Sequence, residues 1–199
     1  MDVIRKEVFC SFVKKVFGVP PTDLLSEESI EYFNSKIRVV KLSKGEFLQI
    51  EGDVSKFWGV VTEGLVRIYY MHGDDEVTEQ LVSEGEDFMD YESFLDQVPS
   101  RRFIQMVEPT TIYLVNRLEC ESMCDVNLEL RNFFRHMTEC LLLHIEKQIH
   151  SSIFKTANER YEHLIEKKPD LILRVPSVYI ASYLGVTPET LSRIRSNVK

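Results

Sequence analysis

The sequence predicts an α+β fold, in which an antiparallel β-sandwich or barrel lies between helical segments and is followed by a C-terminal helix-turn-helix. Three observations carry this prediction. Short apolar stretches alternate with glycine-containing turns over residues 37–118. A segment without glycine or proline, within residues 125–155, has a helical apolar repeat. The last sixteen residues, LGVTPETLSRIRSNVK, combine a glycine turn with a capped second helix.

Residues 1–36 are predicted to be helical. Apolar residues recur in VFCSFVKKVF, and a second helical pattern follows a proline pair in PPTDLLSEESIEYFNSKI. Ser26 precedes Ile30 and Phe33, which share one helical face. Because a serine hydroxyl can accept a free backbone N–H at a helix start, we expect an amphipathic helix that is capped by Ser26.

Residues 37–118 are predicted to form short antiparallel strands. Apolar and β-branched runs such as RVVKL, FWGVVTEG, LVRIYYM and FIQMVEPTTIYLV alternate with turns such as SKGE, HGDDE and SEGED. Short strands at regular spacing are typical of a sandwich or barrel. Glycines that suit turns with positive φ fall at five predicted strand ends, namely Gly45, Gly52, Gly64, Gly73 and Gly85.

Residues 125–155 are predicted to form one long helix with a wide apolar face. One apolar set recurs every three or four residues: Leu130, Phe134, Met137, Leu141, Ile145 and Ile149. A second set lies alongside it: Phe133, Met137, Cys140 and His144. One part of this face could cover the β domain while another part pairs with a second copy of the helix. Packing on the β domain alone is the alternative.

Residues 156–199 contain two proline breaks and a helix-turn-helix pattern. The breaks fall before Pro169 and Pro176, because the residue before a proline is disfavoured in a helix. A short helix is predicted over residues 176–184, with Gly185 as the turn. Its inward residues are expected to be Ile180, Ala181 and Leu184.

The second helix of the pair carries polar residues that suit base recognition. Thr187 is expected to cap it and Pro188 to occupy its first position. Glu189 and Arg193 lie one turn apart on the face opposite the apolar one. Arginine can bond guanine with two hydrogen bonds, and glutamate can accept from cytosine N4. The alternative is a solvated Glu–Arg pair on an exposed helix. The two faces are Leu191, Ile194 and Val198, and Glu189, Ser192, Arg193 and Ser196.

The charge distribution separates this C-terminal segment from the rest of the chain. The net charge is −8 over 199 residues, which argues against non-specific coating of nucleic acid. Residues 174–199 hold four basic residues and one acidic residue, a net +3, so the remainder carries −11. A basic tip on an acidic body is typical of a DNA-contacting end on a non-DNA domain.

The order of these segments and four of their motifs resemble the Crp/Fnr family of bacterial transcription regulators. The motifs are IASYLGVTPETLSRIR, with Glu189-Thr190-x-x-Arg193, and the glycines of KGEFLQIEGD, VVTEGLVRIYY and SEGEDF. The resemblance implies a β-roll (a double-stranded β-helix or jelly roll, similar to a cyclic nucleotide-binding domain) in residues 1–124. It implies a parallel dimerisation helix in residues 125–155. It also implies a helix-turn-helix domain in residues 156–199 that reads a near-palindromic operator in double-stranded DNA.

Contacts to DNA are expected from α-helical and flanking residues of this domain. Because most of the family's β wing is predicted to be lacking, phosphate contacts would come from Arg174, Ser177, Ser182, Arg195 and Lys199, doubled by dimerisation. RNA polymerase is a further partner that such a regulator implies. The predicted DNA-binding set is Thr187, Pro188, Glu189, Thr190, Ser192, Arg193, Ser177, Arg195 and Lys199.

The resemblance fails at the family's phosphate-binding cassette. Members that bind cyclic nucleotides have Gly-Glu after Phe-x, and Arg-Ser/Thr ten residues after that Glu. In FMDYESFLDQVPSRRF, Asp90 replaces the glycine, Tyr91 the glutamate and Arg102 the Ser/Thr, while Arg101 keeps the arginine. A carboxylate beside a ligand phosphate is unfavourable, and a tyrosine cannot accept two ribose hydrogen bonds.

We therefore expect that cyclic AMP is not bound in the family's way. The favoured alternative for the two arginines is a solvated loop with salt bridges to Asp90, Glu92 or Asp96. An unidentified small effector, if there is one, would contact Phe88, Asp90, Tyr91, Arg101 and Arg102, with the facing side of the long helix completing the pocket.

Other chemistries find little support. The cysteines at positions 10, 120, 124 and 140 lack the close repeat of an iron–sulfur site, and His136, His144 and His150 are each better explained by ordinary packing than by haem binding. No catalytic motif is present, so we expect no enzyme and no cofactor or metal. The absence of a signal peptide and of a long apolar run predicts a cytoplasmic protein that does not engage a membrane.

Two hypotheses follow. The first is a dimeric, sequence-specific transcription regulator controlled through its β-roll. The alternative is a β-roll module that binds a small ligand and has lost DNA regulation, with the C-terminal helices as a structural cap.

Overall fold

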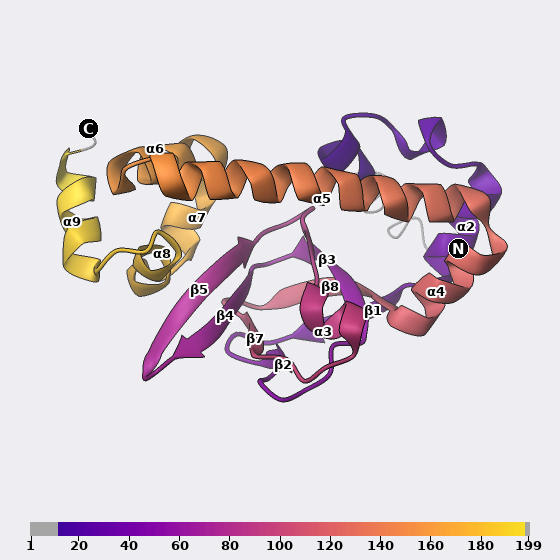
Figure 1. The fold of residues 1–199 in the computed structure, drawn as a ribbon, viewed down its shortest axis with the longest axis horizontal. Coiled ribbons are helices and arrows are strands. Elements are labelled where there is room, and N and C mark those ends of the chain that lie inside the picture. Colours follow the sequence, from indigo (N-terminus) through magenta and orange to yellow (C-terminus); the bar gives the residue numbers. More distant parts are fainter. Residues whose placement is uncertain (1–11, 198–199) are drawn as a thin grey trace.

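The structure, a computed structural model, describes residues 12–197 and contains two antiparallel sheets with helices before and after them (Figure 1). The strands are β1 Arg38–Leu42, β2 Phe47–Gln49, β3 Phe57–Glu63, β4 Val66–His72, β5 Asp75–Val82, β6 Asp87–Phe88, β7 Arg102–Met106 and β8 Thr110–Asn116. The helices are η1 Pro21–Asp23, α2 Glu27–Lys36, α3 Tyr91–Asp96, α4 Arg117–Val126, α5 Leu128–Phe154, α6 Ala157–Lys167, α7 Pro169–Arg174, α8 Ser177–Tyr183 and α9 Pro188–Asn197, and residues 12–17 are also helical.

The strands form the predicted β-roll. One sheet has the order β1-β8-β3-β6 and the other the order β2-β7-β4-β5, with every pair antiparallel. Apolar residues from both sheets fill the space between them: Val61, Val66, Ile68, Val82, Phe88, Ile104, Met106 and Ile112. The predicted α+β class is therefore confirmed.

Two details of the sheet differ from the prediction. The apolar run FIQMVEPTTIYLV forms two strands, because the chain turns within it between β7 and β8. Pro109 lies in this turn, and its carbonyl oxygen stands against Gly64 of the β3–β4 turn, where a β-carbon would be only 2.5 Å away and φ is +94°. Strand β6 was missed because two residues are too short for an alternating pattern.

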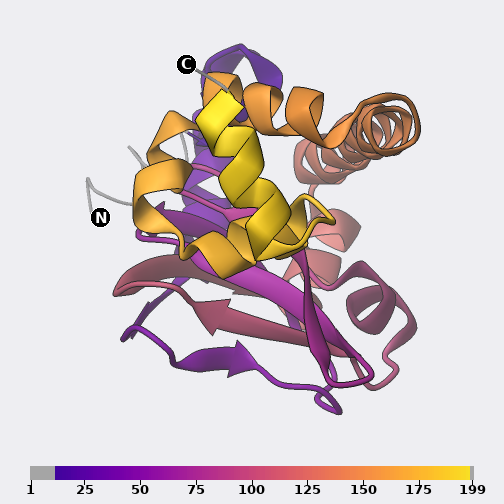
Figure 2. The ribbon, with the colours of Figure 1, turned by 90° about the vertical axis from the view of Figure 1, so that its left-hand side faces the viewer.

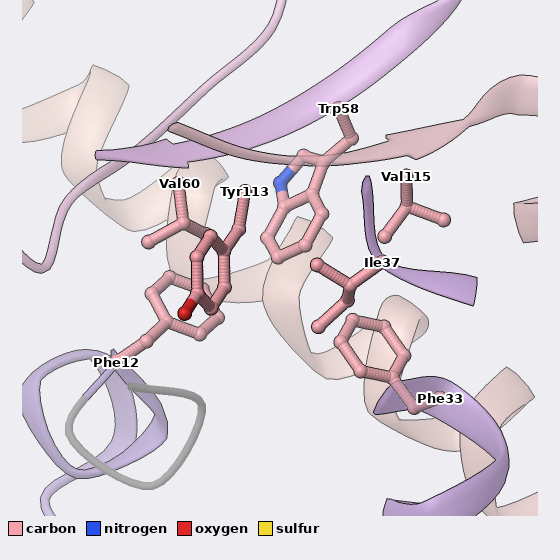
Figure 3. Close-up of a pocket in the computed structure, with 7 residues that line it drawn as sticks. All are labelled: Phe12, Phe33, Ile37, Trp58, Val60, Tyr113 and Val115. Carbon is pink, nitrogen blue, oxygen red and sulfur yellow. The ribbon is translucent and has the colours of Figure 1, made fainter. Parts of the chain in front are cut away.

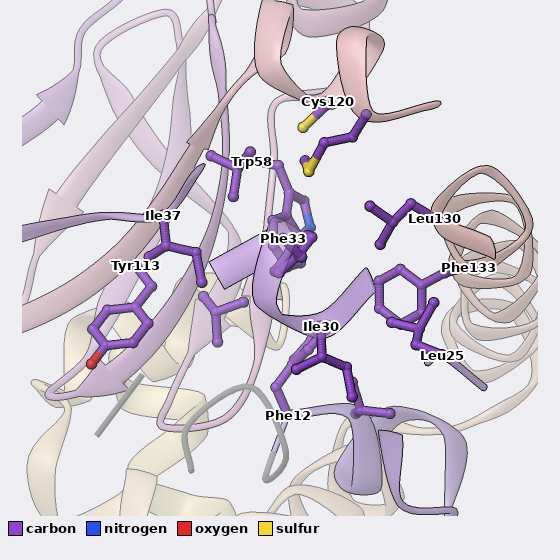
Figure 4. Packing of buried hydrophobic residues seen from close by; sticks show 14 residues of the cluster. Phe12, Leu25, Ile30, Phe33, Ile37, Trp58, Tyr113, Cys120, Leu130 and Phe133 are labelled. Carbon is purple, nitrogen blue, oxygen red and sulfur yellow. The ribbon is translucent and has the colours of Figure 1, made fainter. Parts of the chain in front are cut away.

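A second core joins the outer face of the β1-β8-β3 sheet to the helices (Figure 4). Ser26 caps α2 as predicted, and its hydroxyl accepts the Ser29 N–H at 3.3 Å. Ile30 and Phe33 are then both buried to 1% exposure. The carboxylate of Glu129 accepts from the Ser26 backbone, at 2.8 Å, and from both serine hydroxyls, which ties α2 to the start of α5.

The long helix α5 divides its apolar residues along its length. Residues 125–126 belong to α4, and Asn127 caps α5 by accepting the Leu130 N–H at 3.0 Å. Leu130 and Phe133 are buried against the β-roll core. Leu142 and Ile145, farther along, are 62% and 38% exposed. The wide apolar face therefore covers the β domain with its first part and leaves its second part uncovered.

The C-terminal helices pack on the β-roll and on one another. The breaks predicted at Pro169 and Pro176 separate α6 from α7 and α7 from α8. One hydrophobic core unites residues of these helices with three residues of the roll, Leu65, Leu81 and Val107. Viewed from that end, α9 lies in front of the roll, and α5 is seen along its axis beside it (Figure 2).

Candidate nucleic-acid interface and effector region

The helix-turn-helix forms as its sequence predicts. Gly185 has φ +65° at the turn between α8 and α9. The hydroxyl of Thr187 accepts the Thr190 N–H at 3.2 Å, and Pro188 is the first residue of α9. Leu191 and Ile194 are buried in the core with α8. Val198 lies outside the described residues.

The opposite face of α9 presents its polar side chains to solvent. Glu189, Ser192 and Arg193 are exposed, while Thr190 is half-buried. Arg193 donates from Nη2 to the Thr190 hydroxyl at 3.1 Å, and no ion pair holds it to Glu189. The pKa of the Glu189 carboxyl is lowered by its own backbone N–H, by Thr187 and by the charge of Arg193. The lowered pKa favours the charged form of this exposed carboxylate.

Two of the residues expected at the phosphates face the protein instead. The Arg195 guanidinium donates to the Ser177 hydroxyl at 2.8 Å and lies 6.0 Å from the Tyr161 ring centroid. Arg174 bonds the carboxylates of Glu84, at 2.6 and 2.9 Å, and Glu108. Lys199 lies outside the described residues. In this arrangement the supply of phosphate contacts from the predicted set is small.

Ser182 and a buried arginine complete the contact between the helix-turn-helix and β5. The Ser182 hydroxyl accepts the Thr78 N–H and donates to the Glu76 carbonyl, both at 2.8 Å. Arg67 is 1% exposed and its guanidinium lies over two rings, 4.2 Å from Tyr69 and 3.7 Å from Tyr179 of α8. The sequence patterns did not predict that α8 packs on β4 and β5. The position of Arg67 inside the apolar run LVRIYYM could have indicated it.

The cassette region of the roll is filled by the protein's own charges. Asp90 is 1% exposed and caps α3, accepting the Ser93 N–H at 3.4 Å. Its carboxylate also accepts from the Gln49 amide at 3.0 Å and from the Ser100 hydroxyl. Arg102 donates to it at 3.1 Å. The buried Asp90 carboxylate therefore already accepts the hydrogen bonds that a ligand phosphate would need.

Arg102 in turn has a second carboxylate partner. It donates to Glu79 at 2.6 and 3.2 Å, and hydrogen bonding to Glu79 raises the pKa of the guanidinium. Glu92 lies 3.9 Å away, so the salt bridges expected for this loop form on Arg102. They involve a buried Asp90 rather than the solvated one that we expected. Arg101, the residue aligned with the family's arginine, is exposed.

The other two predicted ligand residues are packed rather than open. Phe88 is 1% exposed in the core of the roll. Tyr91 is half-buried. Its burial and, to a lesser extent, the charge of the nearby Asp87 raise the pKa of its hydroxyl. An apolar cavity does exist beneath the outer sheet, lined by seven side chains that converge in Figure 3, but its volume is about 10 Å³. A cavity of this volume has room for about one water molecule and is too small for an effector.

The cysteines and acidic residues form no metal site within residues 12–197, where no group of three or more His, Cys, Asp or Glu side chains is suitably arranged. Burial raises the pKa of the Cys120 thiol to about 12 and also raises that of Cys124. Cys10 lies outside the described residues. No helix in that same range is long and apolar enough to cross a membrane.

No protein-family model and no curated protein sequence matches the chain. Solved structures do match. FixK2 from Bradyrhizobium japonicum is 26% identical, with a TM-score of 0.69 over 81% of this chain and 84% of that one. A CooA variant from Carboxydothermus hydrogenoformans is 24% identical, with a TM-score of 0.63 over 82% and 76%. The catabolite activator protein of Thermus thermophilus is 20% identical, with a TM-score of 0.55 over 87% and 84%.

The chain has the Crp/Fnr fold. The matches extend over most of the chain, so the β-roll, α5 and C-terminal helices are shared as one arrangement. Two side-chain networks hold this fold together: Asp90 with Arg102 in the roll, and Arg174 of α7 with Glu84 of the roll. Glu79, Glu84 and Glu108, which bond these arginines, come from distant turns and strands and gave no sequence signal.

Proposed function

We propose that the protein is a dimeric, sequence-specific DNA-binding transcription regulator in which α9 reads the major groove. One observation carries the proposal. Glu189 and Arg193 project to solvent one turn apart, on a helix whose other face is held in a core by Leu191 and Ile194. A rigidly mounted helix with an exposed Glu and Arg presents the groups that complement cytosine and guanine edges.

Dimerisation through α5 supports the same proposal. Its second half exposes Leu142, Ile145 and Ile149, to 62%, 38% and 55%. The spacings of three and four match the a and d positions of a coiled coil. Pairing with a second copy of α5 would remove this stripe from water and add a second α9 to the DNA-binding surface. Two reading helices related by a twofold axis imply a near-palindromic operator.

Control by a cyclic nucleotide bound in the family's usual way is not part of the proposal. Asp90 and Glu79 already neutralise Arg102, and a phosphate would have to displace one of these carboxylates. We instead propose an unidentified small effector acting on the β-roll, and RNA polymerase as a partner at the promoter. The protein is proposed to act by binding rather than by catalysis.

A ligand-binding module that has lost DNA regulation remains the second candidate. The observation that favours it is the shared core between the helix-turn-helix and the roll, which a structural cap would also form. The exposed pair on α9 favours the regulator, because a cap has no use for that pair of side chains.

Operator binding by an Arg193→Ala variant tests the regulator directly. DNA selected by the wild-type protein is titrated in a fluorescence anisotropy assay. Loss of two base contacts per dimer should weaken binding roughly 100-fold. Arg101→Ala removes an exposed arginine from the roll and is the matched control, with unchanged affinity expected. Equal binding by wild type and the Arg193→Ala variant would overturn the proposed role of α9.

A further inference from the structure

A groove lined by polar and charged residues lies where α5 meets α6, outside the predicted DNA-binding and effector residues. Its volume is about 440 Å³, and its lining is Glu146, Lys147, His150, Ser151, Lys155 and His163. Two lysines face one carboxylate, although the whole chain carries a net charge of −8. Within residues 12–197, neither Lys147 nor Lys155 forms an ion pair, and both have solvent access. The lining therefore carries a net positive charge on an acidic protein, and the charge of Lys155 also acts on the nearby Glu159 carboxylate.

The helix dipole accounts for only one of these two lysines. Basic side chains favour the last turn of a helix, where they meet its free carbonyl groups, and the effect fades beyond that turn. Lys147 lies about two turns before the end of α5 at Phe154. Lys155 is the C-cap residue of α5, where the dipole does favour a basic side chain, so Lys147 is the lysine that the dipole leaves unexplained.

Arg160 ties the groove to the reading helix. Its Nη1 donates to the Lys155 carbonyl at 3.0 Å and its Nη2 to the Leu184 carbonyl at 2.8 Å. Leu184 begins the turn that leads into α9. One guanidinium thus fixes the groove relative to the turn of the helix-turn-helix. Figure 2 shows the end of α5 and all of α9 on the side of the molecule that faces the viewer.

The groove also stays accessible in the proposed dimer. If Leu142, Ile145 and Ile149 occupy a, d and a positions of the seam, Lys147 falls at f and His150 at b. Positions b and f point away from the partner helix in a coiled coil. Pairing of two α5 helices therefore leaves both grooves open to solvent.

We propose that this groove binds the DNA backbone, with Lys147 and Lys155 contacting phosphates outside the bases read by α9. The inference rests on the proposed function and extends it. Arg174 and Arg195 bond groups of the protein itself and are not available for phosphate contacts. The two groove lysines would supply such contacts in their place. An open, solvated groove suits a duplex, which is held by rows of exposed cationic side chains, better than a small anion that needs buried donors.

The test is the salt dependence of operator binding by the double variant Lys147→Gln/Lys155→Gln. Each lost phosphate contact lowers the slope of log K against log salt by about 0.9, so four contacts per dimer lower it by about 3 to 4. Affinity should fall at least about tenfold at moderate salt, for operator and random DNA alike. Lys41→Gln/Lys44→Gln removes the same charge from exposed positions of the roll, and its slope should equal that of the wild type.

The outcomes separate the two levels of the proposal. Wild-type binding with an unchanged slope in the groove variant would overturn the groove as a phosphate site and leave the regulator intact. Failure of the wild-type protein to bind any selected DNA would overturn the proposed function and the groove together. Circular dichroism and molar mass of both variants show that fold and dimer are kept, and phosphate ethylation interference on wild-type and groove-variant complexes should reveal the contacts that disappear.

Discussion

The cassette region of the roll and the exposed face of α9 use similar residues in opposite ways. Arg102 is bonded to Asp90 and Glu79, and Asp90 is bonded in addition to Gln49 and Ser100. On α9, Arg193 makes one hydrogen bond to a neighbouring hydroxyl and leaves the rest of its guanidinium to solvent. A charge satisfied internally stabilises the fold, whereas a charge left to water is available to a partner. This difference supports α9, rather than the cassette region, as the proposed recognition surface.

The largest effect on DNA binding is expected from disrupting the apolar stripe of α5, because the proposed dimer seam places two α9 helices on one operator. Leu142→Glu/Ile145→Glu places carboxylates in the proposed seam, so the protein should become monomeric and lose bivalent operator binding, roughly a thousandfold. Light scattering and anisotropy measure the two effects. Leu173→Glu is the control, since Leu173 is 88% exposed on α7 and lies outside α5. A dimeric double variant would contradict the proposed seam.

The cassette should respond in stability rather than in DNA recognition. Asp90→Asn removes a buried charge from Arg102 and weakens the bonds to Gln49 and Ser100, so unfolding by urea should require about 2–3 kcal/mol less free energy. Asp96→Asn, at an exposed position of the same short helix, should change that free energy little. If the Asp90→Asn variant is as stable as the wild type, the network does not hold the roll as described.

A smaller effect on stability is expected where Arg174 of α7 bonds Glu84 and Glu108 of the roll. We call this contact the Arg174 clamp. Burial would raise the pKa of Glu84, but hydrogen bonds from Arg174 and from backbone N–H groups outweigh it, and the pKa is lowered from 4.5. A lowered pKa means that the clamp stabilises the fold above pH 4.5 and is lost as the pH falls through the folded-state value.

Glu84→Gln should therefore destabilise the protein by less than about 1 kcal/mol at pH 7, because these groups are partly exposed. The variant should lose less stability than the wild type between pH 7 and pH 3. Urea unfolding at both pH values measures this difference. Identical pH dependence in the two proteins would show that Glu84 is not the titrating group.

The smallest expected effect is no effect at all. Cyclic AMP added to the wild-type protein should give no binding heat at micromolar concentration, because Asp90 occupies the phosphate's donors and Tyr91 stands in place of the ribose acceptor. Isothermal titration calorimetry measures this. Micromolar binding would contradict the comparison between a closed cassette and an open reading face.

The sequence predicted the elements whose cause is local. Ser26, Thr187 and Gly185 set helix boundaries through their own caps and turn, and the structure places them as expected. Alternation predicted most of the strands. The helix-turn-helix core followed from spacing, since Leu191 and Ile194 are buried.

Features that depend on distant partners could not be predicted. Arg102 rather than Arg101 faces Asp90, and only the strand positions of β5 and β7 decide this by bringing Glu79 close. Arg195 is a basic residue that could contact a phosphate, yet its guanidinium donates to the Ser177 hydroxyl instead. The docking of α8 on β5, and the groove at the α5–α6 elbow, likewise arise from how helices pack rather than from any motif.

Selection of DNA from a random-sequence pool at low ionic strength tests the central claim most directly. We expect enrichment of an inverted repeat whose half-sites are centred about ten base pairs apart, which is one helical turn. We also expect that the Arg193→Ala variant fails to enrich that repeat. Absence of any enriched sequence with the wild-type protein, or enrichment of the same repeat by the variant, would contradict α9 as the reading helix.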